Sequence, residues 1–91
     1  MDNQALIQQC IDMIPDKNKP VMFDTAMIVK NSPHNEICRC YGVVVTDDDE
    51  LKLMDAEENW HILLPNQIMA DLVASTLLQR LKTMAMKKSF A

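Results

Sequence analysis

Residues 41–54, with the sequence YGVVVTDDDELKLM, decide how this chain folds. Two apolar segments flank four consecutive acidic residues. A run of four like charges is typical of a solvated turn, because a buried segment would have to desolvate them together. The apolar segments on either side have the composition of strands. The stretch therefore predicts a hairpin, with one strand over residues 36–46 and the next beginning at Leu51.

Gly42 is the only glycine of the chain and lies inside the first of these strands. A glycine in a strand interior indicates a β-bulge or the close approach of another backbone. Apolar residues occupy both faces of the strand, with Tyr41 and Val43 on one face and Cys40 and Val44 on the other. We therefore expect this strand to lie in the middle of a sheet.

Two further strands extend the sheet from this hairpin. Residues 21–30 alternate and place Val21, Phe23, Thr25, Met27 and Val29 on one face. Residues 60–64 alternate as well. Between the third and fourth strands, Asp55 followed by Glu58 is compatible with a hairpin turn or with a capped helical turn. The short alternating flanks favour the hairpin.

A helix is predicted at each end of the strand region. Residues 3–14 carry apolar side chains at three- and four-residue spacing. Pro15 ends this helix, because the residue before a proline avoids the helical conformation. Residues 66–87 repeat the spacing over a longer stretch, with Asn66 as the expected N-cap.

These elements predict a small α+β fold in the order α-β-β-β-β-α, an antiparallel meander of four strands flanked by two helices. A length of 91 residues suits a single domain, which we place at residues 1–91. A small SH3-like barrel with terminal helices is the alternative. The single glycine disfavours the barrel, because tight barrel corners usually need glycine.

The charge distribution limits the classes of partner. The formal net charge is −4, with five cations and twelve anions in residues 1–65 and four cations and one anion in residues 66–91. Nucleic-acid binding needs a clustered cationic face and is not expected. We see no signal peptide and no apolar run near the roughly 20 residues of a membrane span. The sequence thus predicts an acidic cytoplasmic protein that binds no membrane.

Three cysteines are an odd number, which fits a reducing compartment better than a disulfide framework. The candidate metal ligands are His34, Cys38 and Cys40, joined by Cys10 or His61, because thiolates and imidazoles bind zinc and copper(I). Zinc sites usually place such cysteines in a turn, whereas this pair falls on a strand. Buried cysteine also packs as a small hydrophobe. We therefore predict no metal and no cofactor.

No residue pattern predicts catalysis, because we find neither a nucleophile with a placed base nor a glycine-rich phosphate loop. We expect a protein-interaction or accessory module without catalytic activity. Eight methionines suit an adaptable surface, and the last helix is apolar over more than one packing face. The predicted partner is a second copy, forming a homodimer, or another protein, and the predicted contact residues are Met69, Val73, Leu77, Leu81 and Met84.

Two alternatives remain open at this point. In the first, both apolar faces of the last helix are filled within one chain. In the second, the chain is a small metal-binding or thiol-redox protein that uses Cys38 and Cys40.

Overall fold

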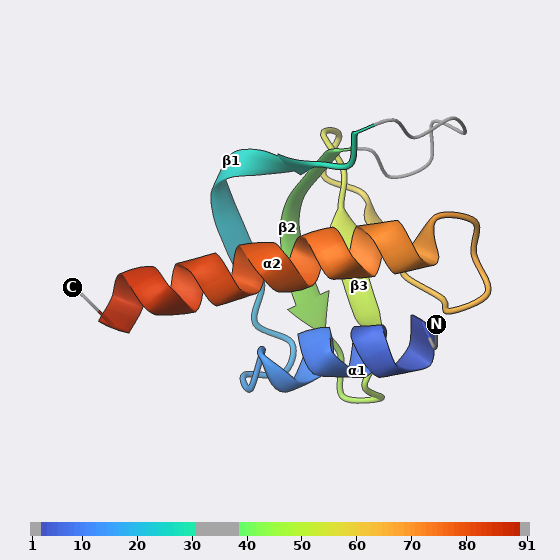
Figure 1. Ribbon diagram of the computed structural model, residues 1–91, viewed down its shortest axis with the longest axis horizontal. Helices are drawn as coiled ribbons and strands as arrows, with labels where there is room; N and C mark the ends of the chain where they lie inside the picture. Colours follow the sequence, from blue (N-terminus) through green and yellow to red (C-terminus); the bar gives the residue numbers. More distant parts are fainter. Residues whose placement is uncertain (1–2, 31–38, 90–91) are drawn as a thin grey trace.

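The computed structural model describes residues 3–30 and 39–89. Helices and strands follow one another in the order α-β-β-β-β-α, which confirms the predicted fold class (Figure 1). Their bounds are α1 Asn3–Asp12, β1 Val21–Ile28, β2 Arg39–Val45, β3 Leu51–Met54, β4 Trp60–Ile62 and α2 Ala70–Ser89. The part of the second predicted strand over residues 36–38 lies outside the described residues.

The four strands form one antiparallel meander in the spatial order β1-β2-β3-β4. β1 and β4 are therefore the two edges of an open sheet. A barrel requires its first and last strands to pair, so the SH3-like alternative is wrong.

Both helices lie on the same face of the sheet, and the core fills the space between them and the strands (Figure 1). Alternate residues of the central strands point into this core. Val43 pairs with Leu53, and Val45 pairs with Leu51. All four side chains are almost completely buried, as expected for a sheet with one face covered by helices.

β1 departs from the regular alternation that its sequence predicts. Its register against β2 shifts between Met22 and Met27, and Thr25 is exposed instead of buried. Arg80 of α2 donates a hydrogen bond to the Thr25 carbonyl and another to its hydroxyl at 2.8 Å. The Arg80 guanidinium also lies 5.2 Å from the centroid of the Phe23 ring. Thr25 thus bonds to a polar partner on α2 and is not part of the apolar core.

The acidic run forms the turn between β2 and β3, as predicted. Thr46 and Glu50 close it, since the Thr46 amide donates to the Glu50 carbonyl at 2.9 Å and the Glu50 amide donates to the Thr46 hydroxyl at 3.1 Å. Asp49 takes a positive φ of 60°, which aspartate tolerates better than most residues. The turn leaves its carboxylates in solvent.

Residues 55–59 form the β3–β4 hairpin turn and not a helical turn. One carboxylate oxygen of Asp55 accepts hydrogen bonds from the amides of Glu57 and Asn59, each at 2.9 Å. The Asp55 amide donates to the Asn59 carbonyl at 2.9 Å. Asp55 thus closes the turn with its own side chain and backbone, as Asx turns do.

The last helix begins four residues later than the predicted range, at Ala70 instead of at Asn66. Gln67 ties the preceding loop to β4, because its amide nitrogen donates to the Ile62 carbonyl at 3.3 Å and its amide oxygen accepts from Leu64 at 3.1 Å. Met69 then has a positive φ of 70°. A residue in that conformation cannot continue a right-handed helix, so the regular turns start after it.

Neither helix in residues 3–30 and 39–89 has the length and apolarity that crossing a lipid bilayer requires.

Candidate protein-interaction surface

An apolar surface covers the face of the sheet that points away from both helices. The strand register forms two rows on this face, one across all four strands and one across β2, β3 and β4. We call these residues the outer sheet face: Met22, Gly42, Met54 and Trp60 in the first row, and Val44, Lys52 and Ile62 in the second. Both described helices lie on the opposite side (Figure 1).

The outer sheet face is packed separately from the core. Val44 and Met54 are buried, at 9% and 8% exposure, yet they do not belong to the core cluster. Met22 and Trp60 at the edge strands remain exposed to 53% and 38%. The outer sheet face thus presents two large exposed apolar side chains, a feature that can mark an interaction site.

Gly42 allows Met22 to lie flat across β2. A β-carbon at position 42 would stand 2.8 Å from the Met22 sulfur and 3.1 Å from the Val21 carbonyl oxygen. The close approach expected from a strand glycine is therefore that of the neighbouring strand β1, including the side chain of Met22. Gly42 adds no side chain of its own to the outer sheet face and leaves room there for the apolar side chain of Met22.

Acidic turns lie at both ends of the outer sheet face. The β2–β3 turn at one end carries Asp47, Asp48, Asp49 and Glu50, and the β3–β4 turn at the other end carries Asp55, Glu57 and Glu58. Lys17 pairs with Asp49 and offsets one of these charges. Between the two ends, the face itself contributes one cation, Lys52. The surface therefore has a mainly apolar middle that includes Lys52, and the two described turns add negative charge at its ends.

The turn beside Trp60 is held by a hydrogen bond between Asp55 and His61, which is an ion pair when His61 is protonated. The Nε2 atom of His61 lies 2.7 Å from the second carboxylate oxygen of Asp55. This hydrogen bond, followed by those from the Asn59 and Glu57 amides, lowers the pKa of Asp55 below 3.8. Asp55 thus keeps its negative charge while it holds the hairpin that presents Trp60.

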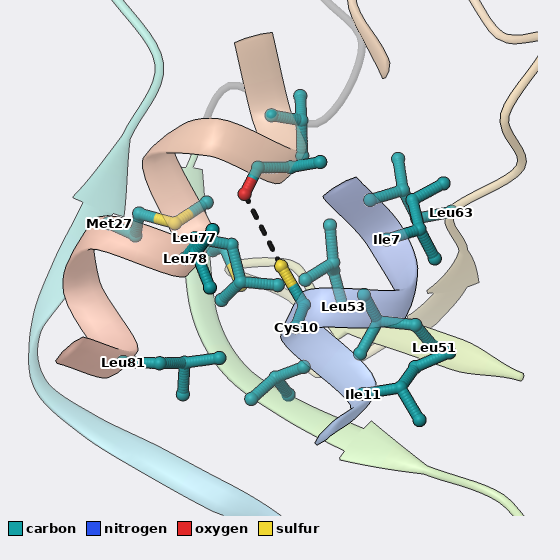
Figure 2. Packing of buried hydrophobic residues seen from close by; sticks show 14 of the residues in the cluster. Ile7, Cys10, Ile11, Met27, Leu51, Leu53, Leu63, Leu77, Leu78 and Leu81 are labelled. Atoms are coloured by element: carbon teal, nitrogen blue, oxygen red, sulfur yellow. Dashed lines mark hydrogen bonds between the residues drawn. The ribbon is translucent and has the colours of Figure 1, made fainter. Parts of the chain in front are cut away.

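The residues predicted to bind a partner through the last helix lie at the chain's own core. Val73, Leu77 and Leu81 are buried in it, and Met69 and Met84 pack against it. Figure 2 shows Leu77 and Leu81 among the buried side chains of the other elements. A partner cannot reach these three buried side chains unless α2 leaves the sheet.

α1 accounts for much of the apolar width of α2. The helices lie beside one another (Figure 1), and Cys10 of α1 donates a hydrogen bond from its thiol to the Ala74 carbonyl at 3.3 Å (Figure 2). Leu78 lies in the same cluster. The apolar faces of α2 are thus covered by the sheet and by α1 together, apart from Leu72 and Met86, which are 37% and 62% exposed.

The predicted metal ligands are only partly described by the structure. His34 and Cys38 lie outside the described residues. Cys40 is fully buried, and its thiol donates a hydrogen bond to the Gly42 carbonyl at 3.0 Å. Cys10 is buried beside α2, and His61 contacts Asp55. No group of three metal-ligating side chains comes together within residues 3–30 and 39–89.

Burial raises the pKa of both described thiols. The Cys10 pKa rises from 9.0 to about 11 through desolvation alone. Desolvation also raises the pKa of Cys40, against the smaller lowering effects of the backbone groups of Gly42 and Met54 and of the Arg80 charge. A reactive thiol needs the opposite shift, so these two cysteines have the properties of core residues.

Met22 and Trp60 were not among the residues predicted to bind a partner. The alternation of β1 and β2 contained part of the signal, because each of these strands carries apolar residues on both faces. The sequence does not say which face the helices cover. Only the placement of α1 and α2 identifies the face that remains open.

Comparison with known protein families, curated proteins and solved structures finds no match to this chain.

Proposed function

We propose that this chain is a small protein-interaction module that binds another protein through the outer sheet face. The observation that supports this function most directly is the position of Trp60 and Met22. Both are large, apolar and exposed, and they flank the buried Val44 and Met54 on a face that neither described helix covers. The helices and the core cluster lie on the other side of the sheet, so Met22 and Trp60 do not contribute to that core.

The composition of the face suits binding. Tryptophan and methionine are enriched in the buried centres of protein interfaces, and tryptophan is prominent among the residues that dominate binding energy. Methionine adapts its shape to a partner because its thioether chain is flexible. Trp60 is the only tryptophan of the chain, so we expect its removal to weaken association more than the removal of any neighbour.

This proposal keeps the predicted protein-interaction module but moves its contact surface from the last helix to the outer sheet face. Val73, Leu77 and Leu81 are buried in the chain's own core and so are not available to a partner. The alternative of a metal-binding or thiol-redox protein stays a prediction, because Cys38 lies outside the described residues. The buried Cys40 with its raised pKa does not favour it.

Site-specific crosslinking in the cells that make the protein tests this function. A photo-reactive phenylalanine analogue replaces Met22 in one variant and Gln79, an exposed residue on α2, in the control variant. We expect the analogue at position 22 to form a discrete adduct with another polypeptide. The analogue at position 79 should form none.

Two results would contradict the proposal. Equal adducts from both positions would mean that the outer sheet face has no special part in binding. An absence of any adduct from position 22, in a variant whose circular dichroism and melting temperature match the parent, would mean that the face binds no protein. An adduct between two copies of this chain would support an interaction module but make the partner a second copy.

A further inference from the structure

We infer that the segment bound by the outer sheet face is an amphipathic helix with lysine or arginine near both of its ends. This inference rests on the proposed function and specifies the chemistry of the partner. It follows from the charges at the ends of the face, the length of the face and the symmetry that a second copy would impose.

The charges favour a cationic partner. The two turns that bound the face carry seven of the thirteen acidic residues of the chain. At one end Asp47, Asp48 and Asp49 are exposed, and at the other end Glu57 and Glu58 are exposed. A partner that crosses the face along the strands passes over both turns. Complementary cations at its two ends would speed encounter and determine its placement.

The length of the face suits a short helix. Glu50 and Asp55 bound β3 and lie five residues apart, which is about 17 Å at a strand rise of about 3.3 Å per residue. A helix spans that distance with about 11 or 12 residues, at about 1.5 Å per residue. One apolar stripe on such a helix would pack against the exposed side chain of Trp60 and would complete a second layer on the sheet.

A second copy of the chain fits this face poorly. A two-fold axis between two face-to-face sheets with aligned strands runs either parallel or perpendicular to the strands. The first arrangement places each acidic turn opposite its own copy, and the second places the β2–β3 turn opposite the β3–β4 turn. Like charges meet at both ends in either case, and such juxtapositions disfavour association.

Trp60 provides a direct readout for a peptide-binding test with the purified full chain. The probe is a capped peptide of about 14 residues, with leucine and isoleucine along one helical face and two lysines at each end. The matched probe has glutamate in place of each lysine. We expect the lysine peptide to shift the Trp60 emission to shorter wavelength and to saturate. We expect the glutamate peptide to bind at least about tenfold more weakly, a difference of about 1.4 kcal/mol.

Charge variants separate the contribution of the turns from that of net charge. Glu57→Gln with Glu58→Gln removes two charges at one end of the face, whereas Asp12→Asn with Asp71→Asn removes two charges from the helices on the other side. The first pair of substitutions should weaken binding of the lysine peptide at least about threefold, and the second pair should change that binding little. Added salt should weaken binding of the lysine peptide but not binding of the glutamate peptide. Met22→Thr should weaken both peptides, because it removes apolar area without adding charge.

The outcomes distinguish this inference from the proposed function. Equal binding of the two peptides, or equal effects of the two variant pairs, would overturn the cationic partner and leave the interaction module in place. If neither peptide binds but position 22 crosslinks to another polypeptide, the inference again fails and the function stands. If neither peptide binds and no crosslink forms, both fail. A stable dimer that Met22→Thr dissociates would overturn the cationic partner in favour of a second copy.

Discussion

The side chain of Met22 occupies the space above Gly42 where any other residue would place its β-carbon. Such an atom would lie 2.8 Å from the Met22 sulfur and 3.1 Å from the backbone oxygen of Val21. The first contact can relax, because the methionine chain is flexible. The second cannot relax without moving β1. Gly42 therefore couples the packing of β1 on β2 to the shape of the outer sheet face.

This relationship predicts that Gly42→Val lowers the free energy of unfolding by about 1–3 kcal/mol, as overpacking does. In a Met22→Ala background the loss should be smaller, because one of the two collisions is gone. We expect a coupling energy on the order of 1 kcal/mol from the double-mutant cycle, measured by urea denaturation. Strict additivity of the two substitutions would show that the contact has no energetic role.

Leu77 and Leu72 are the same residue type on the same helix, α2, but they differ in burial. Leu77 is completely buried and Leu72 is 37% exposed. Leu77→Ala should therefore destabilise the fold by about 2–5 kcal/mol through the lost transfer energy and the cavity. Leu72→Ala should change stability by about 0.5 kcal/mol, as surface substitutions do. Equal losses in denaturant titrations would contradict the placement of Leu77 in the core.

The Asp55–His61 ion pair predicts a specific sensitivity to acid. The pKa of Asp55 is lower in the folded protein than its ordinary value of 3.8, so its contribution to stability is present above pH 3.8 and disappears as the pH falls through the folded value. Asp55→Asn can still accept the turn hydrogen bonds but carries no charge. We expect its melting temperature to fall less steeply than that of the parent below pH 3.8.

Glu57→Gln is the control for this measurement, since it removes a carboxylate from the same turn and leaves the Asp55–His61 contact intact. Its profile should follow that of the parent. If Asp55→Asn and the parent lose stability with the same slope in acid, the ion pair contributes nothing to the pH dependence.

Cys10 predicts a sensitivity to alkali. Its pKa rises from 9.0 to about 11 in the folded state, so between these values the thiol ionises only on unfolding. Unfolding then releases a proton, and stability declines as the pH rises through this interval. Cys10→Ala should flatten the decline between pH 9 and about 11 when melting temperatures are compared. An unchanged slope would mean that the folded thiol ionises as readily as the unfolded one.

Local sequence patterns determined the order of the elements. The alternation around Gly42, the acidic run at residues 47–50 and the break at residues 55–59 each act over a few neighbouring residues. Turn chemistry and strand spacing are therefore visible without the rest of the chain, and the strand order and the open meander followed from them. The prediction for Thr25 failed where a distant group intervenes, since Arg80 of α2 bonds to it. The start of α2 was predicted too early because Gln67 makes local contacts with Ile62 and Leu64.

The interaction surface was decided by the tertiary structure alone. Periodicity showed that α2 is apolar on more than one side, and that strands such as β2 are apolar on both faces. It could not show which of these surfaces meet each other. Docking of α1 beside α2 buries Leu77 and Leu81 in the core and leaves Met22 and Trp60 exposed. Hydrophobic burial is non-directional and depends only on the area removed from water, so the choice among several apolar faces rests on how the whole chain packs.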